Sequence, residues 1–315
     1  MAWSKESTVA TPQGEFRSAV VVGGNGAMGS LLCDNLAGQV ASVTALDLDE
    51  EPRPGTRAAA YLQADALALN AGAKRLLAAA DVVILALPEA VAIQSVRAVR
   101  AAMGDGALLV DTLSVKSQIV DLMRELSPPV ETLSINPMFG PAAGFAGQNV
   151  IAVKVAAGPR AERFIDILRS WGCRIAFRTA TEHDRAMAAL QTATHAAILS
   201  FGMALEKLDY DVSALSTMSS PPHRVLLALL ARILGGEPDV YWDIQAHNRF
   251  APGARDAVRH SIQDLSDMVA GGDEAAFRAR LDRLRTMLGP DLAFLARKCA
   301  ALFDTDRQSE ATRKR

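Results

Sequence analysis

The sequence predicts an α/β domain built on a parallel sheet, followed by an all-helical domain. Two observations lead to this prediction. Short apolar runs alternate with helical patterns through the first half of the chain, which indicates βαβ units. From Thr181 onward, almost every segment has helical periodicity. The chain of 315 residues is long enough for about two domains, and we place the boundary near residue 179.

Seven apolar runs form the predicted sheet. They cover residues 18–22, 42–47, 81–87, 107–111, 131–135, 149–153 and 173–179. Most are apolar at nearly every position, which is typical of parallel strands that are covered on both faces.

The second half begins with a predicted helix cap. Thr181 and Asp184 have the spacing of a capping box, and a long apolar helix follows to about Leu208. Further helices are predicted over residues 222–234, 238–250, 253–270 and 273–304, the last one broken near Gly289-Pro290. The polar ends, residues 1–17 and 305–315, are expected to be flexible. The predicted domains therefore cover residues 18–179 and 180–304.

Charge and cysteine content exclude several classes of protein. The net charge is −2, so the chain has no basic excess that would favour nucleic acid or an anionic membrane. The three cysteines are widely spaced and fit neither a disulfide framework nor a metal site, which indicates a reducing cytoplasm. The N-terminus lacks the apolar segment of a signal peptide, and no uninterrupted apolar run is long enough to span a bilayer. We expect a cytoplasmic protein without a metal, a nucleic-acid partner or a membrane partner.

A glycine motif follows the first predicted strand and begins a helix. It consists of Gly24-Asn25-Gly26-Ala27-Met28-Gly29. The first glycine permits a tight turn, the second lets a pyrophosphate approach the backbone, and the third lets helix and strand pack closely. The free N–H groups and dipole of the helix N-terminus favour the pyrophosphate. This context predicts a Rossmann-type dinucleotide-binding domain.

An acidic residue at the end of the next strand indicates which dinucleotide is bound. Asp47 lies 18 residues after Gly29, where a carboxylate can bind the ribose 2′-hydroxyl. No arginine follows it directly, so NAD is favoured over NADP; Asp49 is the alternative ribose ligand. Leu87 and Pro88 form the expected loop on the nicotinamide side.

Polar residues interrupt two apolar helices of the second half. Gln191 and His195 are spaced i, i+4 and would share a helix face. Arg232 lies in a helix that is apolar nearly all round, and such helices are usually buried. A buried guanidinium needs an anionic partner. In isolation, a structural role is the more common one for both Arg232 and His195, but an anionic ligand would explain them together.

Several motifs together resemble one known family. They are VVGGNGAMGSLL, DTLSVK (111–116), INPMFGP (135–141), WGCRI (171–175), EHDRAMAALQTATH (182–195), SSPPHRVLLALLARIL (219–234) and PDVYWDI (238–244). In order and spacing they resemble the prephenate dehydrogenases, specifically the bacterial type that is often fused to chorismate mutase. The resemblance extends from about Val20 to about Leu265.

The resemblance implies a fold, a reaction and roles for individual residues. The helical domain would form a homodimer, and the substrate would be a small dicarboxylate. A cyclohexadienyl ring would lose hydride from C4 to NAD, and its ring carboxylate would leave as carbon dioxide. By motif, Ser114 would hydrogen-bond the C4 substituent, and Arg232 would bind a substrate carboxylate. Gln191 and His195 would line the same pocket.

One residue departs from the family pattern. Where the family has a histidine that accepts the C4 hydroxyl proton, this sequence has Asn136. An amide cannot act as a general base, a contribution of about 10²- to 10⁴-fold in rate. An amine at C4 supplies its own lone pair as hydride leaves, so no base is needed, and Asn136 can still accept an N–H hydrogen bond. We therefore expect 4-amino-4-deoxyprephenate as substrate and 4-aminophenylpyruvate as product, on a route to 4-aminophenylalanine used in some antibiotic pathways.

Three other functions remain open. The chain could be a prephenate or arogenate dehydrogenase with another base; His183 fits a helix-capping region better, and His195 fits substrate binding. It could be an inactive relative that senses NAD or an aromatic metabolite, although Ser114, Arg232 and the glycine motif all remain. A hydroxyacid dehydrogenase would commonly have a catalytic lysine within the 181–208 helix, which contains only Lys207, at its end.

Overall fold

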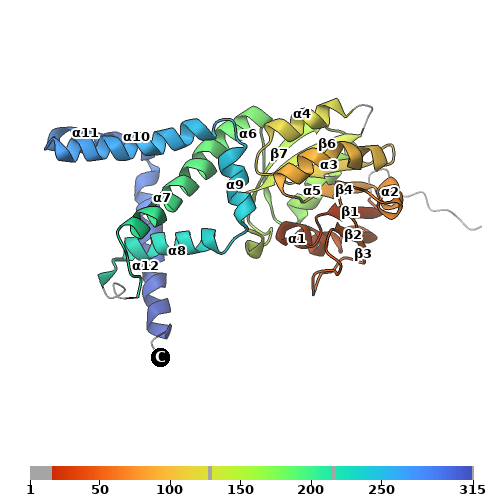
Figure 1. Cartoon of the computed structure of the whole chain (residues 1–315), viewed down its shortest axis with the longest axis horizontal. Coiled ribbons are helices and arrows are strands. Elements are labelled where there is room, and N and C mark those ends of the chain that lie inside the picture. Colours follow the sequence, from red (N-terminus) through yellow and green to blue (C-terminus); the bar gives the residue numbers. More distant parts are fainter. Residues whose placement is uncertain (1–15, 127–129, 214–217, 314–315) are drawn as a thin grey trace, which may run out of the picture. The chain divides into compact units, whose positions relative to one another are not determined.

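The computed structural model describes residues 16–126, 130–213 and 218–313, with side chains up to residue 305. The chain divides into two compact units, residues 1–185 and 186–315, and the division falls inside helix α6 (Ala180–Met187). Figure 1 labels the elements of both units. The boundary predicted from sequence lies at the start of this helix. Most of the N-terminal segment that was expected to be flexible lies outside the described residues.

The first unit is built on one eight-stranded sheet (Figure 1). Its strands are β1 (Ser18–Val22), β2 (Ser42–Asp47), β3 (Ala60–Gln63), β4 (Val82–Leu85), β5 (Leu108–Asp111), β6 (Glu131–Pro137), β7 (Asn149–Ala156) and β8 (Arg174–Phe177). The strand order is β3-β2-β1-β4-β5-β6-β7-β8. The first six strands have the order of a dinucleotide-binding sheet, which confirms the predicted fold class.

The sheet differs from the prediction in two respects. Strand β3 was not predicted, because its sequence AYLQ is a short, half-exposed edge without an apolar run. Strand β7 runs antiparallel to β6, whereas all strands were expected to be parallel. The connection between β6 and β7 contains only the short 3₁₀ turn η1 (Pro141–Ala143), and a parallel crossover needs a longer connection.

Helices cover both faces of this sheet, which explains why its central strands are apolar at every position. Helices α1 (Ala27–Leu36) and α5 (Pro159–Ser170) pack on one face. Helices α2 (Ala71–Ala78), α3 (Glu89–Ala102) and α4 (Ser117–Glu125) pack on the other. Alternate residues of β1 therefore enter two separate cores: Val21 enters the first, and Val20 and Val22 enter the second.

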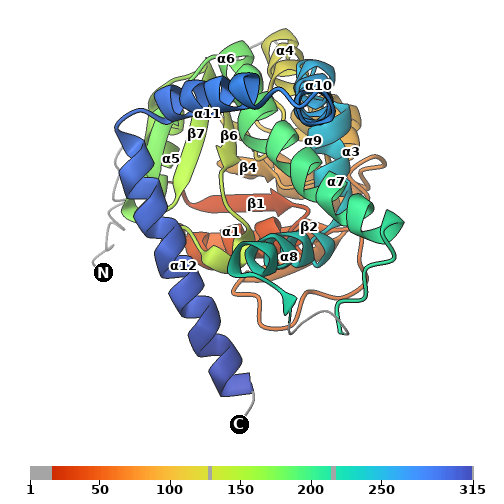
Figure 2. The same ribbon diagram turned by 90° about the vertical axis from the view of Figure 1, so that its left-hand side faces the viewer.

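The second unit is helical throughout its described residues. It contains the end of α6, the π-helical turn η2 (Ala188–Ala193), α7 (Thr194–Lys207), α8 (Pro221–Leu234), α9 (Pro238–Ala246), α10 (Ala251–Ala270), α11 (Glu274–Leu288) and α12 (Asp291–Arg313). Figure 2 shows α8, which packs against α7 and α12. The predicted break occurs at Gly289, whose φ is +52°. Helix α12 continues to Arg313, through a segment that was expected to be flexible.

The cap of α6 differs from the predicted capping box. The backbone N–H and hydroxyl of Thr179 both donate to Glu182 Oε2 at 2.9 Å, and the Glu182 N–H donates to Thr179 Oγ1 at 3.2 Å. The box is therefore Thr179–Glu182 and not Thr181–Asp184. Asp184 has a different role, because its side chain is buried.

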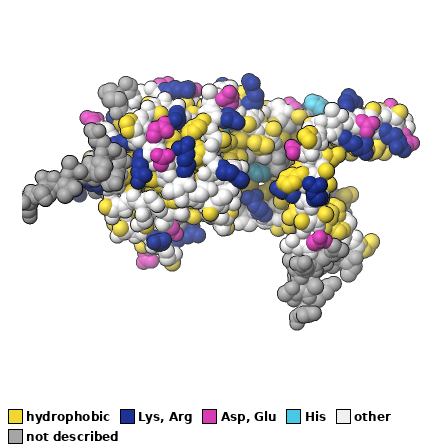
Figure 3. Space-filling model, turned by 180° about the vertical axis from the view of Figure 1, so that it is seen from behind, with side chains coloured by type: hydrophobic (Ala, Val, Ile, Leu, Met, Phe, Trp, Pro, Cys, Tyr) yellow, Lys and Arg dark blue, Asp and Glu magenta, His cyan; other side chains and the backbone are white. Residues whose placement is uncertain are grey.

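The helices of the second unit leave many apolar side chains exposed. Met203, Leu208, Leu234, Trp242, Val269 and Met287 are each more than half exposed. Figure 3 shows hydrophobic side chains on the surface of this unit.

Residues Ala180–Lys207 also have the length and mean hydropathy of a membrane span, contrary to expectation. One such stretch is weak support for a span, because core helices of soluble proteins meet the same criteria.

Candidate active site

The glycine turn between β1 and α1 brings chain segments close together. Gly23 has a φ of +84°, and a Cβ there would lie 2.2 Å from the Ala86 carbonyl oxygen. The turn conformation that we expected at Gly24 therefore belongs to Gly23. At Gly24, a Cβ would lie 2.5 Å from Ala45 Cβ, and at Gly29 it would lie 1.9 Å from the Gly23 carbonyl oxygen. Gly24 and Gly29 thus permit close packing against β2 and against the turn.

The N-terminus of α1 lies where a dinucleotide pyrophosphate is expected. Gly26 is its N-cap residue and has no side chain that could accept from the first turn. Strand β1 lies between β2 and β4, which is the point where the strand order reverses. Ligands of open α/β sheets bind at the carboxyl ends of strands at this point. Leu87 and Pro88 follow β4 at the same edge.

Asp47 ends β2 beside the glycine turn. Its Oδ2 accepts from the Asn25 N–H at 2.8 Å, and its Oδ1 accepts from the Leu48 N–H at 2.8 Å. Asp49 Oδ2 instead accepts from the side chain of Asn25 at 3.0 Å. Arg53 lies in the same loop, and its N–H donates to Asn25 Oδ1 at 2.9 Å. Two bonded oxygens leave the Asp47 carboxylate with free acceptor capacity for a ribose hydroxyl.

Asn136 lies near the end of β6 and is 1% exposed. Its backbone is paired with Ile151 of β7. Its side-chain Nδ2 lies 2.9 Å from Nε2 of His183, a fully buried residue of α6. We expected His183 to belong to a helix-capping region, but its side chain contacts Asn136. On its buried side, the Asn136 amide therefore contacts an imidazole ring.

Asp184 holds His183 and the start of α4 together. Its Oδ1 lies 2.8 Å from His183 Nδ1 and accepts from the Lys116 N–H at 2.8 Å. Its Oδ2 accepts from the Ser117 N–H at 2.8 Å and from the Ser117 hydroxyl at 2.5 Å. Burial favours the neutral acid, but these hydrogen bonds outweigh burial and hold the pKa of Asp184 below its usual value.

Lys116 forms a buried ion pair next to β6, the strand that contains Asn136. Its Nζ lies 2.8 Å from Asp111 Oδ1 at the end of β5 and donates to the Ile135 carbonyl oxygen at 2.5 Å. Both charged side chains are fully buried. Burial lowers the pKa of Lys116, and the neighbouring Asp111 carboxylate opposes that shift. This lysine, whose role the sequence left open, fixes the backbone on the N-terminal side of Asn136.

Ser114 lies in the turn between β5 and α4 and is partly buried. Asp111 and Lys116, which flank it in sequence, hold the two ends of this turn through their ion pair. Because Lys116 also donates to the Ile135 carbonyl oxygen, the turn is anchored to β6, the strand that contains Asn136. Ser114 and Asn136 remain the predicted contacts of the substrate's C4 substituent.

Gln191, His195 and Arg232 all lie in the second unit. Gln191 belongs to the π-helical turn η2, although a regular α-helix was predicted, and such turns are frequent at functional sites. Gln191 Oε1 and His195 Nδ1 are buried and have no hydrogen-bond partner among the described residues. The His195 ring packs edge-on against Tyr241, with centroids 5.1 Å apart. Burial, together with the positive charge of Arg232, lowers the pKa of His195.

The prediction that Arg232 lies in a buried helix is wrong. Arg232 is exposed, and Ile233 is the one buried residue among those described in α8. An apolar helix is buried only where another surface covers it, and α7 and α12 cover only part of α8. Arg232 is therefore free to meet an anionic group from outside the unit.

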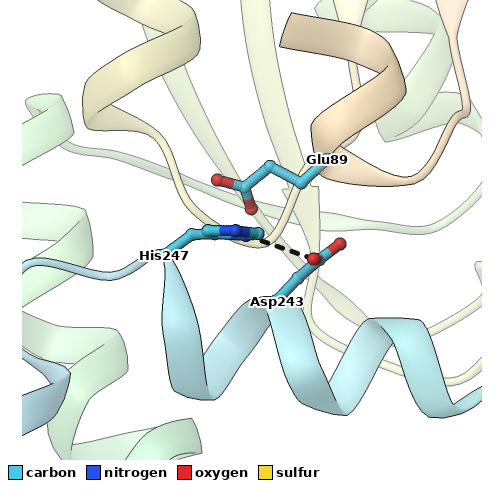
Figure 4. Close-up of side chains that lie close together, drawn as sticks. All are labelled: Glu89, Asp243 and His247. Carbon is cyan, nitrogen blue, oxygen red and sulfur yellow. Dashed lines mark ion pairs between the residues drawn. The ribbon is translucent and has the colours of Figure 1, made fainter.

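A further ion pair lies at the C-terminal end of α9, where His247 is the first residue after the helix. His247 Nδ1 and Asp243 Oδ1 are 3.1 Å apart across one helical turn, as the dashed line in Figure 4 marks. Figure 4 also draws Glu89, the first residue of α3. No role was predicted for Asp243 or His247 from the sequence.

Comparisons with known proteins define the family. The nucleotide-binding domain of prephenate dehydrogenase matches residues 41–151, and its dimerization domain matches residues 179–283. A 4-amino-4-deoxyprephenate dehydrogenase of Streptomyces pristinaespiralis is 44% identical over 91% of this chain and 97% of its own length. A T-protein of Enterobacter agglomerans is 29% identical over 87% of this chain and 68% of its own length.

Solved structures show the same fold. A prephenate dehydrogenase from A. aeolicus, in complex with hydroxyphenyl propionate and NAD⁺, has a TM-score of 0.63 at 16% identity and covers 86% of this chain and 96% of its own. A Synechocystis arogenate dehydrogenase has a TM-score of 0.62 at 15% identity and covers 85% of this chain and 98% of its own.

The sheet order and the glycine turn define a dinucleotide-binding α/β domain. More narrowly, the chain belongs to the prephenate dehydrogenase family. The predictions of the family, of an NAD-dependent oxidoreductase and of a two-part fold are confirmed.

Proposed function

We propose that this protein catalyses the NAD-dependent oxidative decarboxylation of 4-amino-4-deoxyprephenate to 4-aminophenylpyruvate, on a route to 4-aminophenylalanine. The observation that carries the proposal is Asn136, a buried amide where the family pattern has a proton-accepting histidine. The relative from Streptomyces pristinaespiralis, whose name states this activity, supports it at 44% identity.

The chemistry explains why an amide suffices. As hydride leaves C4 for the nicotinamide, a neutral amine donates its lone pair and forms a C=N⁺ bond. Loss of carbon dioxide returns the electron pair of the C–C bond to the ring, and a neutral arylamine results. The amine therefore loses no proton in the reaction. A hydroxyl is a much weaker donor unless a base removes its proton at the same time.

The predicted site residues keep their proposed roles. Residues 24–29, Asp47, Leu87 and Pro88 would hold NAD, with the pyrophosphate at the N-terminus of α1. Ser114 and Asn136 would contact the C4 amine. Gln191 and His195 would line the substrate pocket, and Arg232 would bind a carboxylate of the dicarboxylate substrate.

Assembly and location are part of the same proposal. The exposed apolar side chains of the helical unit, Trp242 among them, fit a homodimer formed through this unit. The match to a dimerization domain supports this. We further propose a cytoplasmic location, and the predictions of no nucleic-acid and no membrane partner stay predictions.

A second candidate function is prephenate or arogenate oxidation, and one observation favours it. His183 lies directly behind Asn136, and burial lowers its pKa, which keeps the imidazole neutral and able to accept a proton. Against this candidate, Nε2 of His183 is already bonded to the Asn136 amide, and the His183 side chain has no exposed surface. A buried, occupied nitrogen is a poor proton acceptor for a substrate.

The direct test compares two substrates. Purified protein and NAD⁺ are mixed separately with prephenate and with 4-amino-4-deoxyprephenate, and NADH formation is followed. We expect strong preference for the amine, with kcat/KM rising with pH through the amine's own pKa. Equal or better turnover of prephenate contradicts the proposal and favours the second candidate.

A substitution at Asn136 tests the role of the amide. Asn136→His should restore a base and raise prephenate turnover by roughly 10²- to 10⁴-fold, a typical general-base contribution. Asn136→Gln is the matched control, because it keeps an amide and should bring no gain with prephenate. A similar gain in both variants would mean that space, and not a base, limits prephenate turnover.

A further inference from the structure

The carboxylate of Asp184 offers only acceptors to its neighbours. Three of its hydrogen bonds come from the Lys116 N–H, the Ser117 N–H and the Ser117 hydroxyl, and the two backbone groups can only donate. A carboxylate that accepts several such bonds is held in its ionised form. His183 Nδ1, which lies 2.8 Å from Oδ1 of this carboxylate, must therefore carry a proton and donate it.

This proton fixes the tautomer of His183. The ring is fully buried and lies near the charged Lys116, and both effects disfavour a second proton on the ring. The charge and hydrogen bond of Asp184 act in the opposite direction, but the pKa of His183 still lies below its usual value. His183 is thus a neutral imidazole with its proton on Nδ1 and a lone pair on Nε2.

The lone pair in turn fixes the amide of Asn136. The group 2.9 Å from His183 Nε2 must be a donor, and in Asn136 only Nδ2 can donate. The amide oxygen Oδ1 is then directed away from His183. Among the described residues, His183 is the single hydrogen-bond partner of the Asn136 side chain. Oδ1 therefore remains available as an acceptor.

We propose that His183 and Asp184 are positioning residues that orient the Asn136 amide so that Oδ1 accepts an N–H from the substrate's C4 amine. This rests on the proposed function, because it explains how Asn136 serves an amine. An acceptor leaves the nitrogen lone pair free to form the C=N⁺ bond as hydride leaves. It also stabilises the N–H groups as they become positively charged.

The opposite orientation would slow the same step. If Nδ2 faced the substrate, its N–H would donate to the nitrogen lone pair that must expel the hydride. The Asp184–His183 pair prevents this orientation. His183 Nε2 carries no proton, so it cannot donate a hydrogen bond to Asn136 Oδ1. A hydrogen bond to a charged group gives a rough measure of the effect, about 10- to 100-fold in rate.

The first experiment removes the acceptor behind Asn136. His183→Phe keeps a planar ring without nitrogen. The Asn136 amide can then rotate so that Oδ1 and Nδ2 exchange places. We expect kcat for the amine substrate to fall roughly 10- to 100-fold while KM changes less than about threefold. The deuterium isotope effect at C4 should rise, because hydride transfer becomes more rate-limiting. His183→Gln, whose Oε1 can accept from Asn136, should recover part of the loss.

A matched control separates positioning from general damage. His260 is exposed on α10, and its ring bonds only to Arg259 among the described side chains. His260→Phe is the same substitution outside the site and should leave kcat and the isotope effect unchanged. An unchanged kcat and isotope effect in a folded His183→Phe would overturn the proposal.

A measurement on the unsubstituted protein covers the case in which His183→Phe does not fold. Histidines labelled with ¹⁵N report by NMR which ring nitrogen carries the proton, and His183→Gln assigns the resonance. We expect a protonated Nδ1 and an unprotonated Nε2 at neutral pH; a proton on Nε2 overturns the proposal. Failure of the proposed function is a separate result, because it appears as loss of amine preference in the unsubstituted protein.

Discussion

The polar side chains of the candidate site lie in both units, and two pairs of them differ: Asp184 and Lys116 of the first unit make hydrogen bonds within the chain, whereas Gln191 and His195 of the second unit each have a buried atom without a partner among the described residues. Asp184 accepts hydrogen bonds from the start of α4, and Lys116 pairs with Asp111. In the second unit, Gln191 Oε1 and His195 Nδ1 are buried without a partner among the described residues. Buried polar atoms are nearly always satisfied in native structures, so we expect these two atoms to meet a water molecule, a ligand or a partner subunit.

This difference indicates two kinds of functional group. The group around Asn136 is set before any substrate arrives, as preorganised catalysis requires. We expect the group around Gln191 to be completed by a ligand or by a partner subunit. Substitutions in the first group should therefore reduce stability, whereas substitutions in the second should reduce activity without loss of stability.

The largest effect is expected at the buried ion pair. Lys116→Met leaves the Asp111 carboxylate buried and unpaired, which should lower the free energy of unfolding by about 3–5 kcal/mol. Urea denaturation measures this change. The double variant Lys116→Met/Asp111→Leu removes both charges and should recover part of the loss. A loss below about 1 kcal/mol in the single variant would break the comparison, because the first group would then not contribute to stability.

A smaller effect is expected at Gln191, where a substitution should not lower the free energy of unfolding. Gln191→Leu removes a buried, unsatisfied oxygen, so the free energy of unfolding should stay constant or rise by about 1 kcal/mol. The KM for substrate should rise about tenfold if this oxygen meets the substrate. Gln245→Leu is the matched control, since Gln245 Nε2 donates to the Thr192 carbonyl oxygen at 3.0 Å. That variant should lose stability instead.

The smallest effect is a pH dependence of stability from His183. Burial lowers its pKa from the usual 6.5, with a further contribution from Lys116, while Asp184 and Asp111 oppose the shift. The unfolded chain therefore binds a proton that the folded chain does not bind. This contribution to stability is complete above pH 6.5 and is lost as pH falls through the lowered folded pKa.

Urea denaturation at several pH values isolates this contribution. The stability difference between the unsubstituted protein and His183→Gln should narrow as the pH falls below 6.5, because the variant lacks the titrating group. His195, whose pKa is also lowered, is present in both proteins, so its contribution cancels in the difference. A constant difference across this range would mean that His183 does not bind a proton differently on folding.

The sequence predicted the parts of the fold that depend on local pattern. Continuous apolar runs identified most strands, and Gly289 was correctly placed at a helix break. The direction of β7 was missed, because an apolar run specifies a strand but not its direction. The π-turn at Gln191 was also missed, since helical periodicity does not distinguish one wider turn.

The candidate site was predicted unevenly for a related reason. The glycine turn and Asp47 are local and had a recognisable spacing. His183 is distant in sequence from Asn136, and its polar neighbours in sequence fit a helix cap equally well. One indication of a buried role for His183 was present in the sequence: Asp184 completes a run of four polar residues, 181–184, just before a long apolar helix. Arg232 was placed in the right unit, but its burial was misjudged because one chain does not show what covers α8.

The hydrogen bond between Asn136 and the His183–Asp184 pair has an evolutionary consequence. Nε2 of His183 requires an N–H from residue 136, and either an asparagine amide or a histidine ring can supply one. The two residues' codons differ by a single base. A lineage could therefore pass from a hydroxyl to an amine substrate in one mutational step, without a folding-defective intermediate, because the supporting residues would accept the old and the new side chain alike.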